Sequence, residues 1–294
     1  MRYYLGIDGG GSVTRAVLAD ELGIAVARCE AGSIHYRAVG YAAARANLRY
    51  IAAQLARPVR ACFIGNAALA GPAPEGELRA LTEGVLQAER LAMDSDLYIA
   101  LEAMRVHGPC AVAIAGTGSM AAGRAGEGRP IVHTGGWGYL LGDEGSGFHI
   151  GWEALRAALQ GYEGGGPATA LTGEMCAFYG ADAPEELLGL FYDPPMERQK
   201  IAAFAQRVLR CEDDAVARGI IRGCAAAFAA TARALLRKLP PETPLGLWGG
   251  MFQHSEEYRR AFCRALEKQA ELLPCPPEMG AVWAAMKLAR GELS

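Results

Sequence analysis

Hydrophobic positions in the first third of the chain follow two different periods. Short runs rich in β-forming residues are separated by glycine turns, and longer segments carry apolar residues at helical spacing. The predicted strands are residues 3–7, 13–18, 24–28 and 59–64, and the predicted helices are residues 41–55, 77–89 and 96–106. Strands that alternate with helices in this order predict an α/β layer structure.

The remainder of the chain begins in the same way and then becomes mostly helical. A strand is predicted at residues 110–115, and a long glycine-rich segment follows it at residues 116–151. Further predicted elements are helices at 201–209, 215–239, 255–272 and 280–290 and a short strand at 245–248. We therefore predict two domains, residues 1–108 and 109–294, and the last helix (about 280–294) can pack back on the first of them.

A similar turn follows the first strand of each predicted domain. Each turn joins two apolar runs, is rich in glycine and ends in a serine. The two turns are Gly9, Gly10, Gly11 and Ser12, and Gly116, Thr117, Gly118 and Ser119. Backbone N–H groups that small residues leave exposed can surround a phosphate, and the hydroxyl adds a donor. The P-loop signature is absent from the sequence, so the repeated turn predicts another kind of nucleotide clamp, suited to phosphoryl transfer.

Two carboxylates are candidates for the chemistry. Asp8 stands at the end of the first strand, where it can hold Mg²⁺ or accept hydrogen bonds from turn amides. Asp96 belongs to the run Asp94-Ser95-Asp96 at the start of a predicted helix. Such residues are common helix N-caps, but a carboxylate there can also accept a proton from an attacking hydroxyl. The residues predict Asp8 as a Mg²⁺ ligand, and they leave the catalytic base open between Asp94 and Asp96.

The segment 135–147 is dense in glycine and also contains two aromatic residues and an Asp-Glu pair. An aromatic face next to a carboxylate suits a hydroxyl-rich ligand such as a sugar. The alternative interpretation is a structural loop in which Trp137 fills the core. A second glycine pair, Gly249-Gly250, follows a predicted strand and suits contact with an adenine ring.

Composition restricts the class of protein. The chain has 294 residues, of which 51% are hydrophobic, and a formal net charge of −3 without a basic run, so we expect no nucleic acid as a partner. Its eight cysteines are scattered, with no C-x-x-C pair to indicate a zinc or redox site. No secretory signal and no apolar stretch of membrane-spanning length is recognised. We expect a cytoplasmic protein without a membrane partner.

These motifs, in this order, resemble the BadF/BadG/BcrA/BcrD ATPase family and, within it, the N-acetylglucosamine kinases. The resemblance runs from Gly6 to the last helix and is most specific at 115–119 and 135–146. It implies an α/β protein of two ribonuclease H-like domains with mixed sheets, the actin-like ATPase fold, with the nucleotide in the interdomain cleft. It also implies ATP and Mg²⁺ as cofactors, a sugar as substrate, and a homodimer.

The resemblance assigns roles to individual residues. The phosphate loops would be Gly9, Gly10, Gly11 and Ser12, and Gly116, Thr117 and Gly118, with Gly249 and Gly250 at the adenosine. Asp8 would bind the metal and Asp96 would be the base. The sugar site would comprise Ser119, Gly136, Trp137, Gly138, Asp143 and His35.

The sequence departs from the family at the sugar site. Relatives carry a sugar-contacting Asn after the third strand, whereas His35 lies closest to that position here. The substrate is therefore predicted as N-acetylglucosamine or a related amino sugar or hexose. Two alternatives stay open: an ATPase that energises or regulates a partner protein, and a sugar or nucleotide sensor with altered catalysis. The cysteine-rich segment of iron–sulfur activators in this fold is not found.

Overall fold

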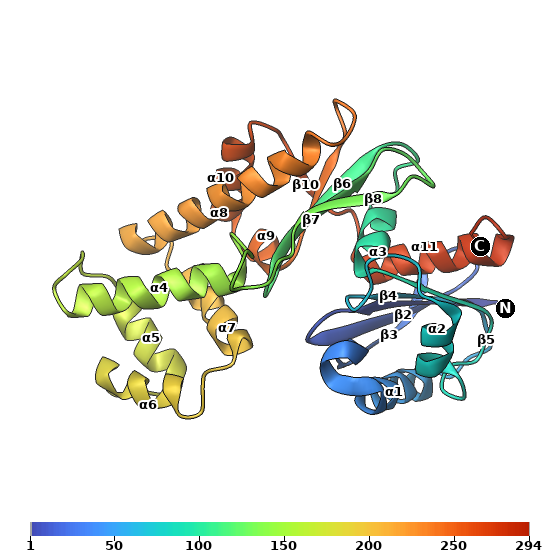
Figure 1. Cartoon of the computed structure of the whole chain (residues 1–294), viewed down its shortest axis with the longest axis horizontal. Helices are drawn as coiled ribbons and strands as arrows, with labels where there is room; N and C mark the ends of the chain where they lie inside the picture. The colour runs from blue at the N-terminus through green and yellow to red at the C-terminus, as the bar shows by residue number, and fades with distance from the viewer. Residues whose placement is uncertain (1, 294) are drawn as a thin grey trace. The chain divides into compact units, whose positions relative to one another are not determined.

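The computed structural model describes residues 2–293, which divide into two units (Figure 1). The first unit contains the described residues up to Gly108 together with those from Leu273 onward. The second unit is Pro109–Leu272. Each unit has its own five-stranded mixed sheet within the described residues. The predicted α/β class with two mixed sheets is confirmed.

The sheet of the first unit has the strand order β3-β2-β1-β4-β5. Its strands are β1 (Tyr3–Gly9), β2 (Val13–Ala19), β3 (Ala25–Gly32), β4 (Val59–Asn66) and β5 (Ala88–Asp94). Strands β1, β2 and β3 pair antiparallel, whereas β1, β4 and β5 pair parallel. The parallel pairs bring the carboxyl ends of β1, β4 and β5 to one edge of the sheet, where ligands of α/β proteins commonly bind.

Helices cover both faces of this sheet, as the alternation of strand side chains requires. They are α1 (Tyr36–Gln54), α2 (Glu75–Thr82), α3 (Asp96–Ala103) and α11 (Pro277–Arg290). Leu5 and Ile7 point into a core shared with α1 and α2. Tyr4 and Phe63 point to the other face, into a core shared with α3 and α11. The catalytic-base candidate at the start of α3 is therefore placed by a well-packed layer.

The second unit has the strand order β10-β9-β6-β7-β8 and one large helical core. Its strands are β6 (Cys110–Ala115), β7 (Ser119–Arg124), β8 (Ile131–Gly135), β9 (Leu245–Trp248) and β10 (Glu271–Leu272). Its helices are α4 (Gly147–Tyr162), α5 (Leu171–Tyr179), the 3₁₀ turn η1 (Pro184–Glu186), α6 (Leu187–Tyr192), α7 (Arg198–Val208), α8 (Ala215–Leu236), α9 (Gly250–His254) and α10 (Glu256–Leu266). Strands β6 and β7 form the antiparallel pair that holds the second glycine turn.

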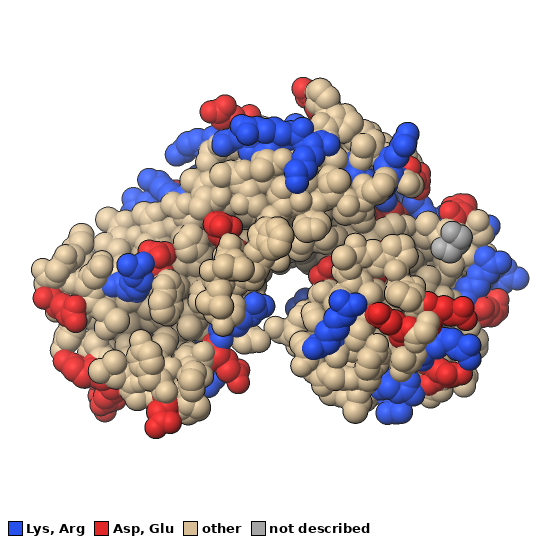
Figure 2. Space-filling model, viewed as in Figure 1, with Lys and Arg blue, Asp and Glu red and all other residues tan. Residues whose placement is uncertain are grey.

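Helix α8 is long and apolar enough to cross a membrane by length and composition. Its apolar residues recur at helical spacing and are buried in the core, as Ile221, Phe228 and Leu235 illustrate. Its other face is basic, with Arg222 exposed, and Figure 2 shows Lys and Arg side chains gathered over α8 and α10. One buried apolar face opposite a charged face is the pattern of a core helix.

Three strands of the structure, β5, β8 and β10, are absent from the sequence prediction. The predicted helix 77–89 is in fact α2 (Glu75–Thr82) followed by β5, and the glycine-rich segment contains β8. The predicted helix 255–272 ends with α10 at Leu266 and is followed by β10. All three missed strands lie at sheet edges. Edge strands are short and carry polar residues, so their hydrophobic pattern is weak.

Residues 273–293 belong to the first unit, whereas the predicted second domain includes them and its last helix can pack back on the first. Helix α11 lies directly against β1 and α3. A Cβ at Gly6 would stand 2.3 Å from the carbonyl oxygen of Glu278, and a Cβ at Gly280 would stand 2.0 Å from that of Ile99. Glycine at these two positions permits the close approach.

Gly280→Ala is expected to destabilise the protein, because the added methyl group meets backbone atoms that cannot move aside. We expect a loss of about 1–3 kcal/mol in the free energy of unfolding. The matched control is Gly219→Ala on α8, where an added Cβ meets nothing within 4 Å. It should gain about 0.5–1 kcal/mol. Urea unfolding checks both, and equal stability of the two variants would contradict the close packing of α11.

Candidate active site

The first glycine turn joins β1 to β2, at the edge where the parallel strands end. Gly9 is required by packing, because an added Cβ would lie 2.5 Å from Ile34 and 2.9 Å from the carbonyl oxygen of Gly65. Gly11 has nothing within 4 Å and does not have positive φ. Neither packing nor backbone conformation explains glycine at position 11. Open space above the backbone is what a loop that contacts a ligand needs.

The second glycine turn repeats this arrangement between β6 and β7. An added Cβ at Gly116 would meet nothing within 4 Å, and Gly116 also lacks positive φ. At Gly118 the same atom would stand 2.9 Å and 3.0 Å from the two carboxylate oxygens of Asp143. Gly118 is therefore glycine because a carboxylate lies directly against it.

Asp143 joins the second glycine turn to the glycine-rich segment. The Ser119 amide donates a hydrogen bond to Asp143 Oδ1 (3.1 Å), and the Ser119 hydroxyl donates to the carbonyl oxygen of Glu144 (2.7 Å). Asp143 is only 4% exposed and has a positive φ of 62°. Helix α4 begins immediately afterward, with Ser146 as its N-cap, and the Gly147 amide donates to the carbonyl oxygen of Gly116 (2.7 Å). Two segments predicted separately thus form one structure.

Tyr258 holds the glycine-rich segment in place through a hydrogen bond to Gly145. This residue was not predicted from the sequence. Its hydroxyl donates to the carbonyl oxygen of Gly145 (2.6 Å), and the tyrosine is fully buried. Gly145 has a φ of 78°, and an added Cβ would lie 2.5 Å from the Phe228 side chain. No sequence motif marks Tyr258, because its partner is far away along the chain.

Gly249 and Gly250 lie beside the second glycine turn within the same unit. Gly249 has a φ of 101°, and an added Cβ would lie 2.3 Å from the carbonyl oxygen of Ala115, the residue before the turn. Gly250 is the first residue of α9. The structure thus brings the residues assigned to the adenosine next to those assigned to the phosphates.

Trp137 lies on the surface. The side chain is 71% exposed, so the interpretation of Trp137 as a residue that fills the core is wrong. Gly136 and Gly138 on either side have positive φ of 74° and 78°. These two glycines let the backbone turn sharply and present the indole ring to solvent.

Asp8 and Asp96 interact electrostatically in the first unit. The pKa of the Asp8 carboxyl is raised to about 8, with burial as the main cause. The negative charges of Asp96 and Glu278 act in the same direction, and the positive charge of Arg15 acts against them. Burial also raises the pKa of Asp96 to about 6, against the hydrogen bonds of nearby amides. Coupled, perturbed carboxyl groups of this kind are typical of functional sites.

The structure separates the two candidate bases. Asp94 is buried, and its Oδ1 accepts a hydrogen bond from the Ser95 amide (2.5 Å). Burial raises its pKa, and the contacts with Ser95 lower it. Ser95 is the N-cap of α3 and accepts a hydrogen bond from the Tyr98 amide (3.2 Å). Asp96 is the first residue of the helix and keeps some exposure, and its negative charge raises the pKa of Asp8. This geometry favours Asp96 over Asp94 as the base.

Glu278 is a second residue that sequence reasoning missed. It lies on α11, is 5% exposed, and accepts a hydrogen bond from Arg28 at Oε1 (3.1 Å). Its Oε2 is buried without a hydrogen-bond partner among the described residues. Because Glu278 is near Asp8 only in the folded chain, no local signal in the sequence could have indicated it.

His35 lies beside the first glycine turn, as the N-cap residue of α1. The preceding Ser33 donates a hydrogen bond to the carbonyl oxygen of Gly10 (3.1 Å). Asn66, at the end of β4, donates to the carbonyl oxygen of Ile34 (3.1 Å). The Nδ1 atom of His35 is buried without a hydrogen-bond partner among residues 2–293. A buried polar atom of this kind is available to a ligand.

The donor set suits Mg²⁺ bound through a single carboxylate. Within the described part of the chain, no group of three or more His, Cys, Asp or Glu residues is arranged to hold a metal ion. Mg²⁺ usually keeps several waters and is held by one or two carboxylates together with substrate phosphates. Asp8, next to the open backbone of Gly11, fits that kind of site.

Known proteins that are similar to this chain include kinases of amino sugars. A model of the BadF/BadG/BcrA/BcrD ATPase family matches residues 5–286. The N-acetyl-D-glucosamine kinase of Dictyostelium discoideum is 28% identical to this chain over 96% of this chain and 97% of that protein. The N-acetylmuramic acid/N-acetylglucosamine kinase of Clostridium acetobutylicum is 38% identical over 97 residues, which are 33% of this chain and 31% of that protein.

The fold has counterparts among solved structures. A candidate N-acetylglucosamine kinase from Porphyromonas gingivalis has a TM-score of 0.78 to this chain, with 21% identity and full coverage of both chains. At this level of identity the similarity shows the fold alone.

Proposed function

This chain belongs to the BadF/BadG/BcrA/BcrD ATPase family, and on that premise we propose that it transfers the γ-phosphoryl group of ATP to a hydroxyl of an amino sugar. The observation that carries the proposal is the pair of coupled carboxylates, Asp8 and Asp96, beside a glycine turn with open backbone at Gly11. Phosphoryl transfer needs little more than positioning, charge neutralisation and a base for the attacking hydroxyl. N-acetylglucosamine is the first candidate substrate, since kinases of that sugar are similar to this chain.

The proposed reaction gives each group one task. Asp96 accepts the proton of the sugar hydroxyl as its oxygen attacks the γ-phosphorus in line with the leaving oxygen of ADP. In each unit the amides of its glycine turn would bind phosphate, and the hydroxyl of Ser12 would add a donor in the first unit. Gly249 and Gly250 face the adenosine. Asp8 would hold Mg²⁺, which would supply positive charge to the phosphates when bound.

Three groups are proposed to bind the sugar, two of them in the second unit and one in the first. Asp143 accepts sugar hydroxyls with the oxygen that the Ser119 amide leaves free. Trp137 offers an exposed aromatic face between Gly136 and Gly138. His35 offers its unpartnered Nδ1. Groups of these kinds suit a ligand that combines hydroxyls with an apolar face.

The proposal is tested by ATP consumption with Mg²⁺ across a panel of hexoses, amino sugars and N-acetylated amino sugars. We expect ADP release that depends on the sugar, with an N-acetylated amino sugar the best substrate. ADP release that is the same without any sugar would instead favour an ATPase that acts on a partner protein. Binding of ATP or sugar without turnover would favour a sensor.

Gly118→Ala tests the role of Asp143. The new methyl group would displace the carboxylate, and misplacing a positioning group by about 1 Å can cost about 10²-fold in rate. We expect a loss of that size in kcat/KM for the sugar. Gly126→Ala is the control in the same unit, because its Cβ would make only an ordinary contact at 3.8 Å. Unchanged kcat/KM in Gly118→Ala would remove Asp143 from the sugar site.

A further inference from the structure

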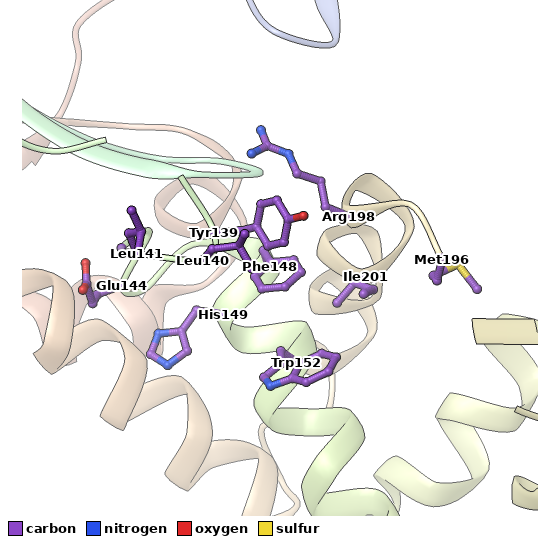
Figure 3. A pocket seen from close by; sticks show the side chains of 11 residues that line it. Tyr139, Leu140, Leu141, Glu144, Phe148, His149, Trp152, Met196, Arg198 and Ile201 are labelled. Atoms are coloured by element: carbon purple, nitrogen blue, oxygen red, sulfur yellow. The ribbon is translucent and has the colours of Figure 1, made fainter. Parts of the chain in front are cut away.

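A cavity of about 570 Å³ opens beside the glycine-rich segment of the second unit (Figure 3). One wall is the loop from Tyr139 to Glu144, of which every residue except Asp143 lines the cavity. The other walls are the start of α4 and the segment from Met196 to Ile201 at the start of α7. The roles proposed above do not use this space, although Gly142 and Glu144, which line it, are the chain neighbours of Asp143.

The cavity has an aromatic wall. The rings of Tyr139 and Phe148 are 4.9 Å apart, and those of Phe148 and Trp152 are stacked 6.1 Å apart. Figure 3 shows the rings of Tyr139 and Phe148 next to each other at the start of α4. Carbon-bound hydrogens of a sugar or of a short aliphatic group can pack on such a wall.

Arg198 brings an uncompensated positive charge to this wall. Its guanidinium group lies 5.7 Å from the centre of the Tyr139 ring, and the side chain is half-buried. Among the described residues, no carboxylate lies within ion-pair distance of it. Elsewhere in the second unit, Arg156, Arg207 and Arg222 each pair with a glutamate. A guanidinium fork left unpaired in a cavity suits a carboxylate or phosphate ligand.

Another part of the cavity is acidic. Glu144 lies there, and Figure 3 shows its carboxylate far from the guanidinium of Arg198. His149 also lines the cavity, and its Nδ1 accepts a hydrogen bond from the Gly145 amide (3.0 Å). Its Nε2 is therefore the nitrogen that carries the proton in the neutral ring. An anion fits only at the Arg198 end, and hydroxyl donors fit at the Glu144 end.

We propose that this cavity receives an acidic substituent of the amino sugar, with Arg198 binding its carboxylate, so that Arg198 sets the preference for acidic over neutral amino sugars. The inference rests on the proposed function for the identity of the sugar ring. A short ether-linked carboxylic acid on the ring has the required form: an aliphatic part against the aromatic wall and an anion at the guanidinium.

The test compares an acidic with a neutral amino sugar. N-acetylmuramic acid and N-acetylglucosamine are assayed for binding by calorimetry and for turnover with ATP. The proteins are the wild type, Arg198→Gln, Arg198→Lys and Arg207→Gln. Arg207 is the matched control, because it lies on the same helix and pairs with Glu174 (3.5 Å). We expect Arg198→Gln to lower the acidic-to-neutral ratio, in binding and in kcat/KM, by about 10- to 100-fold, the value of a charge-assisted hydrogen bond.

Arg198→Lys should retain part of the preference, since it keeps the charge but loses the bidentate geometry. Arg207→Gln should retain the wild-type ratio. An Arg198→Gln ratio equal to that of the wild type would overturn the inference, as would a wild type that binds only the neutral sugar. If neither sugar is phosphorylated but the acidic one binds through Arg198, the proposed function fails and the inference stands.

Discussion

Asp96→Asn is expected to reduce kcat by about 10²–10⁴-fold, the range that general-base catalysis contributes. Asparagine keeps the size of the side chain and its place in the first turn of α3, but it cannot accept the proton of the sugar hydroxyl. The affinity for ATP should change little. Steady-state kinetics with the best sugar of the panel, together with calorimetric titration of ATP, measure the two effects separately.

The pH dependence provides a second measurement of the same residue. Burial raises the pKa of Asp96 to about 6, and a base works only when it is deprotonated. Wild-type kcat/KM should therefore fall as the pH falls through about 6. Asp94→Asn is the control, because Asp94 is engaged with Ser95. A larger loss in Asp94→Asn than in Asp96→Asn would reassign the base to Asp94.

Asp8→Asn is expected to abolish turnover and, at the same time, to stabilise the protein. The pKa of Asp8 is raised from 3.8 to about 8, so the folded protein binds this proton more tightly than the unfolded chain does. Its contribution to stability is present below the unfolded pKa and is lost as the pH rises toward about 8. Near pH 8 the wild type therefore holds a carboxylate in an unfavourable position, and asparagine relieves it. Since Asp8 keeps some exposure, we expect a gain of about 1–3 kcal/mol.

With Mg²⁺ and a nucleotide, the wild type should become more stable than Asp8→Asn. Thermal unfolding with and without Mg²⁺ and a non-hydrolysable ATP analogue measures the effect. Ligands that bind only the folded state raise its stability. The wild type should gain stability from Mg²⁺ with the nucleotide, and Asp8→Asn should gain less. An equal gain in both proteins would show that Asp8 does not hold the metal. A lower stability of Asp8→Asn near pH 8 would contradict the unfavourable position of the carboxylate.

The parts of the fold that the sequence indicated are those with local signals. The glycine turns follow strands with strong apolar runs, and the helix 215–239 has apolar residues at regular spacing, so both were predictable. The strands β5, β8 and β10 were not predictable, because they lie at sheet edges and have weak patterns. The predicted helices 77–89 and 255–272 are too long because β5 and β10 follow α2 and α10 there.

The candidate site was predictable only where its residues belong to a motif. Asp8, Asp96 and Asp143 stand next to glycine turns or at a helix start, and these positions can be recognised in the sequence. Glu278 and Tyr258 act on residues far from them along the chain. Their positions follow from the packing of α11 on β1 and from the core around α8, which no local pattern records.

The charge state of the site was also beyond the sequence. An aspartate in a turn has an ordinary pKa unless the fold withdraws it from water or places another charge beside it. Both conditions hold for Asp8, because the packed layer of α3 and α11 brings Asp96 and Glu278 to the end of β1. The same packing that places the proposed base, Asp96, therefore raises the pKa of the proposed metal ligand, Asp8.

In the proposed reaction a sugar receives the γ-phosphoryl group of ATP. The most direct test follows the fate of that group, with ATP labelled in its γ-phosphate, Mg²⁺ and the best sugar of the panel. We expect the label in a sugar phosphate, in equal amount to the ADP released, and we expect Asp96→Asn to suppress both. Label found in inorganic phosphate, with the sugar unchanged, would contradict the kinase and leave an ATPase.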